Sequence, residues 1–145
     1  AIYRPLNNIF LNKIMEKIRK QYICKHQIKK GMSGAREIIK LYKDGFSMAL
    51  MIDQRVREGI KLNFFGEPAS TTTIPAQIVK KFGCKIVPIY IERIDKFYYK
   101  MKINSPLNFD KNHSIENISS ILNTELEKMV LKKPSQWIWS HDRWK

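Results

Sequence analysis

The chain has 145 residues, 43% of them hydrophobic and 11% aromatic, which is enough for one domain with a core and too little for two ordinary domains. This composition excludes a disordered protein, and the apolar run Met48–Ile52 is far shorter than the about 20 residues of a membrane-spanning helix. The 27 basic and 13 acidic side chains leave a net charge of +14, which favours an acidic partner such as nucleic acid, an anionic membrane surface or an acidic carrier protein.

The first half of the chain predicts two helices and a strand. Apolar residues at four-residue spacing predict a helix near Leu6–Tyr22. Ser33 is a suitable N-cap for a second helix, which runs to about Lys43 and ends at the turn that follows. The apolar segment Phe46–Ile52 then predicts a buried strand, bounded by polar residues on both sides.

The second half alternates in the same way. The hydroxyl-rich segment Ser70–Thr73 opens a predicted helix that ends at Gly83. Lys85–Glu92 predicts a β-strand, and Lys96–Ile103 alternates well enough to be its neighbour. A last helix is predicted over Ile115–Leu131, before an aromatic tail.

Strands that alternate with helices of this length are typical of the α/β class. We therefore predict a single α/β domain over residues 1–145, with a mixed sheet flanked by helices.

Positive charge is concentrated at the front of the chain. Residues 1–43 carry 11 basic and 2 acidic side chains. Lys13, Lys17 and Lys20 recur at helical spacing, so they share one side of the first helix, opposite much of its apolar stripe. This side could meet an acidic protein or anionic lipid headgroups. The alternative is a solvated surface, because the abundance of Ile, Lys and Asn can be a compositional bias.

The segment from Asp53 to Thr73 holds the densest set of polar candidates. Asp53 and Gln54 follow the predicted strand, at the edge where α/β proteins build their sites. The hydroxyls of Thr71–Thr73 come at a predicted helix start, where free N–H groups suit a phosphate. The structural alternative is that Asp53 caps a turn and the threonines cap the helix.

Histidines and cysteines give no catalytic or metal pattern. The chain has three histidines and two cysteines, without the spacing of a zinc site or of a disulfide scaffold, so neither a metal nor another cofactor is expected. His141 stands next to Asp142 in sequence, but adjacent residues rarely orient one another as a catalytic pair. His26 and His113 do not stand out.

Five segments in order carry a resemblance to a known family: Tyr3-Arg4-Pro5-Leu6-x-Asn8, Ile52-Asp53-Gln54, Phe64-Phe65-Gly66-x-Pro68-Ala69-x-Thr71-Thr72-Thr73, Val87-Pro88 and Pro134-x-Gln136-Trp137-x-Trp139-x-His141-x-Arg143-Trp144-Lys145. Together they resemble the lipid A late acyltransferases, the lauroyl and myristoyl transferases of the glycerolipid acyltransferase superfamily. The resemblance implies a glycerolipid-acyltransferase-like α/β fold. It also implies transfer of an acyl chain from acyl carrier protein to a hydroxyl of a lipid A precursor, at the cytoplasmic face of the bacterial inner membrane.

The resemblance also implies which residues bind substrate: Arg4, Asn8, Asp53, Gln54, Gly66, Thr71, Thr72 and Thr73. Arg4 belongs to the block that lies near the acceptor phosphate in this superfamily. Lys13, Lys17 and Lys20 are the expected contact with the carrier protein or the membrane.

One element of the superfamily is missing from the sequence. Its catalytic motif is His-x-x-x-x-Asp/Glu, in which the carboxylate orients a histidine that deprotonates the acceptor hydroxyl. Here Gly31 stands five positions after His26, Ile118 stands five positions after His113, and the chain ends before that position after His141. We therefore expect no catalytic residue in this chain, and interpret it as the C-terminal portion of the enzyme, incomplete at the N-terminus and without the membrane helix.

Two other functions compete with this interpretation. A basic nucleic-acid-binding module fits the charge, but the chain has no recognition motif of that class. A small hydrolase would need a nucleophile set, which the sequence does not contain.

Overall fold

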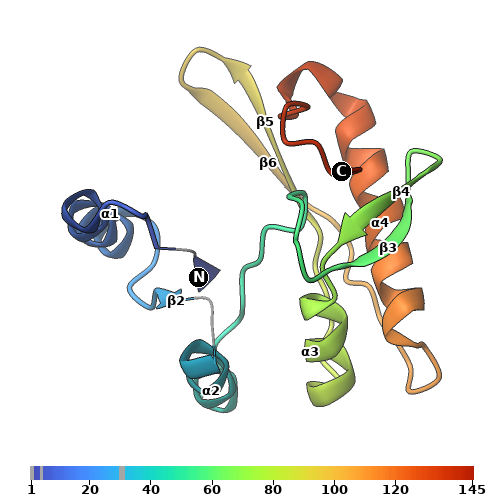
Figure 1. Ribbon diagram of the computed structural model, residues 1–145, viewed down its shortest axis with the longest axis horizontal. Coiled ribbons are helices and arrows are strands. Elements are labelled where there is room, and N and C mark those ends of the chain that lie inside the picture. The colour runs from blue at the N-terminus through green and yellow to red at the C-terminus, as the bar shows by residue number, and fades with distance from the viewer. Residues whose placement is uncertain (1, 4, 30–31) are drawn as a thin grey trace. The chain divides into compact units, whose positions relative to one another are not determined.

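The computed structural model describes residues 2–3, 5–29 and 32–145 (Figure 1), and at positions 32, 33 and 35 it describes the backbone alone. They form two compact units, Ala1–Met51 and Ile52–Lys145, which are described one at a time. The α/β class is confirmed, since four helices occur with three two-stranded sheets in the described part of the chain. The single domain over 1–145 stays a prediction.

The first unit is a short β-α-β arrangement followed by a helix. Strands β1 (Ile2–Tyr3) and β2 (Ile28–Lys29) pair in parallel, and helix α1 (Ile9–Tyr22) connects them. Helix α2 (Met32–Lys43) packs against β2. The helix predicted near Leu6–Tyr22 is confirmed, with its start at Ile9.

Two predictions in this unit need correction. Helix α2 begins at Met32, so Ser33 lies inside its first turn and not at the N-cap. The strand predicted over Phe46–Ile52 is wrong, because no described segment pairs with it and these residues run as irregular chain. An apolar run becomes a strand only where a neighbour satisfies its backbone groups.

The second unit begins with a hairpin. Strand β3 (Ile60–Phe64) pairs antiparallel with β4 (Glu67–Thr71), joined by a two-residue turn. Both central residues have positive φ, 54° at Phe65 and 85° at Gly66, as a type I′ turn requires. Gly66 is therefore explained by the backbone of the turn.

This hairpin corrects the predicted start of the next helix. Ser70 and Thr71 belong to β4, where the pairing with β3 holds them, and helix α3 (Ile74–Phe82) begins only after Thr73. The end of α3 is confirmed, since Gly83 takes the left-handed conformation with φ 63°.

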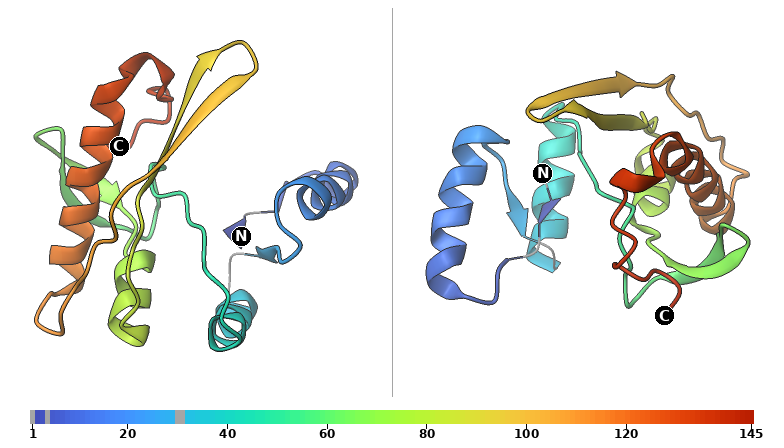
Figure 2. Two further views of the ribbon diagram at one scale, coloured as in Figure 1. Left: turned by 180° about the vertical axis from the view of Figure 1, so that it is seen from behind. Right: turned by 90° about the horizontal axis from the view of Figure 1, so that it is seen from above.

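The remaining elements are a second hairpin and a long helix. Strands β5 (Ile89–Asp95) and β6 (Tyr98–Ile103) pair antiparallel, which confirms the predicted neighbours. The first of them begins four residues later than predicted and ends three residues later. This hairpin extends away from α3 (Figures 1 and 2). Helix α4 (Ile115–Lys132) is capped by Ser114, whose Oγ accepts from Asn117 N at 3.1 Å, and a 3₁₀ turn η1 (Pro134–Gln136) follows it.

The core of this unit lies between α3 and α4. Its buried members are Ala76, Val79, Ile118 and Leu122, and partly buried apolar side chains from the loops and from the start of α4 pack around them. Strand β3 lies against the same helix α4. These contacts fix α4 relative to α3 and to the β3–β4 hairpin. They thereby position the polar side chains that α4 and the hairpin bring together. None of the helices described here is long and apolar enough to cross a membrane.

Candidate functional site

The C-terminal segment brings an arginine into the interior of the second unit. Arg143 O accepts from Ser70 N at 2.9 Å, so the chain end lies along β4. Trp144 Nε1 donates to Phe64 O at 3.1 Å, and Lys61 Nζ donates to Trp144 O at 3.1 Å. With these contacts in place, Arg143 is fully buried, with 0% of its surface exposed.

The guanidinium of Arg143 joins three elements. Its Nη2 donates to Asn123 Oδ1 of α4 at 3.1 Å and to Thr71 Oγ1 of β4 at 3.4 Å. Its Cζ lies 4.1 Å from the ring centroid of Phe64 on β3, at cation–π distance. Asn123 Nδ2 also donates to Thr71 Oγ1 at 2.9 Å and to Asn63 O at 3.0 Å. We call Asp53, Thr71, Asn123 and Arg143 the Arg143 cluster.

The Arg143 cluster contains buried atoms of charged groups that make no hydrogen bond. Nε and Nη1 of Arg143, and Oδ1 of Asp53, are buried without a hydrogen-bond partner in the described part of the chain. Burial lowers the pKa of Arg143 from its ordinary value, and the charges of Asp53 and Glu127 partly oppose this. Asp53 is thus coupled to Arg143 through the field and not through a direct contact.

The structure shows local roles for two of the other predicted substrate residues, Asn8 and Gly66. Asn8, in the first unit, caps α1 by accepting from Phe10 N at 3.0 Å and Leu11 N at 3.1 Å. Gln54 is exposed, and Gly66 sits in the hairpin turn. Arg4 lies outside the described residues.

The start of α3 offers fewer free donors than the sequence predicted. Thr72 Oγ1 accepts from Ile74 N at 3.3 Å, and Pro75 has no N–H. Thr73 Oγ1 accepts from Gln77 Nε2 at 3.0 Å, and Thr71 is buried in the Arg143 cluster. The structure therefore brings Asp53 and Thr71 into one cluster, while Thr72 and Thr73 serve the first turn of α3.

Two members of the site were missed from sequence. Arg143 lies in the C-terminal segment that carries the resemblance, but no role was predicted for it. Asn123 was not singled out. A signal existed, because Ser119, Asn123 and Glu127 recur at four-residue spacing and form a polar line beside the apolar positions of α4. Glu127 Oε1 accepts from Phe65 N at 2.6 Å, so this line faces the hairpin.

A histidine–carboxylate pair occurs at a histidine that the sequence did not single out. His113 Nδ1 lies 2.7 Å from Asp110 Oδ1. Asp110 Oδ1 also accepts from the backbone N of Asn112 at 2.9 Å and of His113 at 3.1 Å. The His113 hydrogen bond is the main cause that lowers the pKa of Asp110. The pair stabilises an exposed turn before α4, and its hydrogen bonds stay within residues 110–113.

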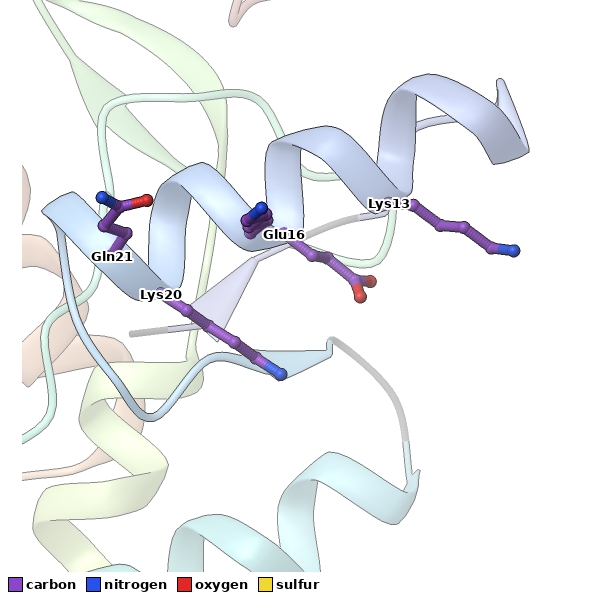
Figure 3. A pocket seen from close by; sticks show the side chains of 5 residues that line it. Lys13, Glu16, Lys20 and Gln21 are labelled. Carbon is purple, nitrogen blue, oxygen red and sulfur yellow. The ribbon is translucent and has the colours of Figure 1, made fainter.

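The predicted basic side of α1 is present in the first unit, but at about 100° per residue it lies beside Phe10 and not opposite the apolar residues. Lys13, Lys17 and Lys20 line a shallow pocket of about 560 Å³ together with Glu16 and Gln21 (Figure 3). All five residues belong to α1, so the pocket is a groove along one helix. Within the described residues, no group of three or more His, Cys, Asp or Glu side chains could hold a metal ion.

Glu16 links this groove to the start of the chain. Its Oε1 accepts from Tyr3 Oη at 2.6 Å and from Asn12 Nδ2 at 2.8 Å, and lies 3.3 Å from Lys29 Nζ. The hydrogen bond from Tyr3 is the main cause that lowers the pKa of Glu16 to about 2. Burial, then the same hydrogen bond, raises the pKa of Tyr3 to about 12.

These two shifts predict stability limits at both ends of the pH scale. Glu16 has a depressed pKa, so its contribution is lost as pH falls from 4.5 toward 2. Tyr3 has a raised pKa, so its contribution is lost as pH rises from 10 toward 12. In urea unfolding followed by circular dichroism, Glu16→Gln should lower the midpoint at pH 7 and flatten the acid limb. Glu37→Gln, which removes an exposed carboxylate on α2, is the control; an unchanged acid limb in Glu16→Gln would contradict the assignment.

The comparison with known families is decisive at this point. The family model described as bacterial lipid A biosynthesis acyltransferase matches residues 1–145, the whole chain. The chain belongs to the bacterial lipid A biosynthesis acyltransferase family. No curated protein matches it.

Proposed function

We propose that the protein serves the transfer of a fatty acyl chain from acyl carrier protein to a hydroxyl of a lipid A precursor. The observation that carries this is the family match over the whole chain. Geometry supports it, because three separate segments that carry the resemblance, around Asp53, Thr71 and Arg143, meet in one cluster. The place of action that fits this chemistry is the cytoplasmic face of the bacterial inner membrane.

We assign the substrate-binding residues to two groups. In the second unit, Asp53 and Gln54 are proposed to contact the acceptor, and Arg4 is proposed to bind an acceptor phosphate. The others are proposed to act indirectly, since each has a local partner or a backbone role: Asn8, Gly66, Thr71, Thr72 and Thr73.

The proton acceptor of the reaction is proposed to lie outside this set. The sequence contains no His-x-x-x-x-Asp/Glu, and the Arg143 cluster contains no histidine. We therefore propose that the 145 residues bind substrate and do not by themselves perform the proton transfer.

Arg4→Ala is expected to weaken binding of a lipid A precursor by about 10-fold or more, because a guanidinium pairs with two phosphate oxygens at once and such a contact contributes about 1.4 kcal/mol or more. The measurement is the Kd of the chain for the precursor in detergent micelles, by calorimetry. Arg36→Ala is the matched control, since Arg36 is an exposed arginine of the same unit. Equal affinities for wild type and Arg4→Ala would refute the assignment of Arg4.

A further inference from the structure

Helix α1 carries a large apolar surface that its own unit leaves uncovered. None of the residues Ile9–Tyr22, all within the described part, is buried. Phe10 is 81% exposed, Ile14 56% and Ile18 41%, and together with Leu11 and Tyr22 they form what we call the α1 stripe. An ordinary surface helix of a globular protein turns such a stripe toward the core.

Here the polar side of α1 faces the protein instead. Glu16 accepts from Tyr3 Oη at 2.6 Å and pairs with Lys29 of β2 at 3.3 Å. The Arg19 guanidinium lies 4.9 Å from the ring centroid of Tyr3. Asn12 donates to Glu16 on the same side. The unit thus holds α1 by polar contacts, and the apolar stripe points the other way.

Basic side chains flank the stripe. At about 100° per residue, Lys17 lies roughly 20° around the helix from Phe10, Lys13 roughly 60° and Lys20 roughly 80°, all on the side away from Ile14. Their ammonium groups extend away from the helix axis, as Lys13 and Lys20 show in Figure 3. An apolar face edged by lysines is the pattern of a helix that lies in a membrane interface, with its apolar side among the acyl chains and its lysines at the headgroups.

We propose that α1 binds an anionic lipid bilayer, with the α1 stripe inserted and Lys13, Lys17 and Lys20 on the phosphates. Charge complementarity favours an anionic surface, and the exposed apolar area favours lipid over an acidic protein. A protein partner held by the lysines alone would leave Phe10 and Ile14 in water. This contact goes beyond acyl transfer and does not depend on it, so either can fail without the other.

The test is binding of the 145-residue chain to vesicles of phosphatidylethanolamine and phosphatidylglycerol, measured by flotation. Phe10→Ser/Ile14→Ser should weaken binding about 10-fold or more, because it removes two side chains from the apolar phase. The matched control is Phe97→Ser/Ile94→Ser, which removes two similarly exposed side chains, 87% and 57%, from the β5–β6 hairpin. Equal losses in the two variants would overturn the proposal.

The charge contribution is tested in the same vesicles. Lys13→Glu/Lys17→Glu/Lys20→Glu should weaken binding about 10-fold or more at low salt, with a smaller effect at high salt. Lys96→Glu/Lys100→Glu/Lys102→Glu makes the same charge change in the hairpin and should have little effect. Wild-type binding that is as strong to pure phosphatidylcholine would overturn the role of the lysines.

Insertion has a direct readout that separates it from protein docking. An environment-sensitive dye on Ile14→Cys, in a Cys24→Ser/Cys84→Ser background, should shift to the blue with vesicles, whereas the same dye on Ser120→Cys of α4 should not. No shift at position 14, combined with lysine-dependent binding to acyl carrier protein that Phe10→Ser/Ile14→Ser leaves intact, would assign α1 to a protein and overturn the membrane proposal. Helicity by circular dichroism verifies that each variant is folded.

Discussion

Replacing Arg143 by alanine is expected to lower the free energy of unfolding of Ile52–Lys145 by roughly 3 kcal/mol or more. Arg143 is fully buried and packs on Phe64, so truncation leaves a cavity where the side-chain stem and guanidinium were. It also removes a donor from Asn123 Oδ1 and from Thr71 Oγ1. Thr71 Oγ1 keeps the hydrogen bond from Asn123 Nδ2, but Asn123 Oδ1 loses its donor, and this adds to the loss.

Urea unfolding followed by tryptophan fluorescence measures this effect, because all three tryptophans lie in the second unit. Arg143→Met separates packing from hydrogen bonding, since it keeps much of the stem and loses the donors; we expect an intermediate loss of about 1–2 kcal/mol. Arg57→Ala, at an exposed arginine of the same unit, should change stability by no more than about 0.5 kcal/mol. An Arg143→Ala midpoint equal to the wild-type midpoint would mean that the cluster does not hold the unit together.

Local signals predicted the helices well. Apolar periodicity placed the last helix at Ile115–Leu131, one residue short of α4, and Gly83 ended α3 as predicted. These features depend on residues within a few positions of one another, such as the cap at Ser114.

Strands were predicted less well, because a strand needs a partner that the local sequence does not identify. Phe46–Ile52 has the composition of a buried strand but no neighbour among the described strands. Ser70 and Thr71 looked like a helix start, yet the type I′ turn at Phe65 and Gly66 pairs them with β3. Pairing across the turn prevailed over local helix-capping preference.

The candidate site shows the same division. Asp53 and Thr71 were predicted, because each stands in a polar segment that attracts attention by itself. Asn123 was not predicted, because a single Asn in a helix shows no role until the β3–β4 hairpin supplies Asn63 O and Thr71 Oγ1 as its hydrogen-bond acceptors. The Asp110–His113 pair was missed for a similar reason, as it depends on a turn that the sequence did not resolve.

The second large effect concerns catalysis. We expect the 145-residue chain to transfer acyl groups about 10²–10⁴-fold more slowly than a family member that carries His-x-x-x-x-Asp/Glu, because a positioned base contributes about that factor. His113 contacts Asp110, but in an exposed turn. Among the described residues, His141 makes no such contact with a carboxylate. His113→Ala and His141→Ala should therefore leave the slow rate unchanged.

The most direct measurement of the central claim incubates the chain with acyl carrier protein loaded with a labelled acyl group and with a lipid A precursor, and follows both precursor binding and label transfer. We predict that the precursor binds, that Arg4→Ala weakens this binding, and that transfer stays at the slow rate, whereas the family member with the histidine motif transfers rapidly under the same conditions. Rapid transfer by the 145-residue chain that His113→Ala or His141→Ala abolishes would contradict the account by placing the base within this chain, and failure of the wild-type chain to bind the precursor would contradict its role in substrate binding.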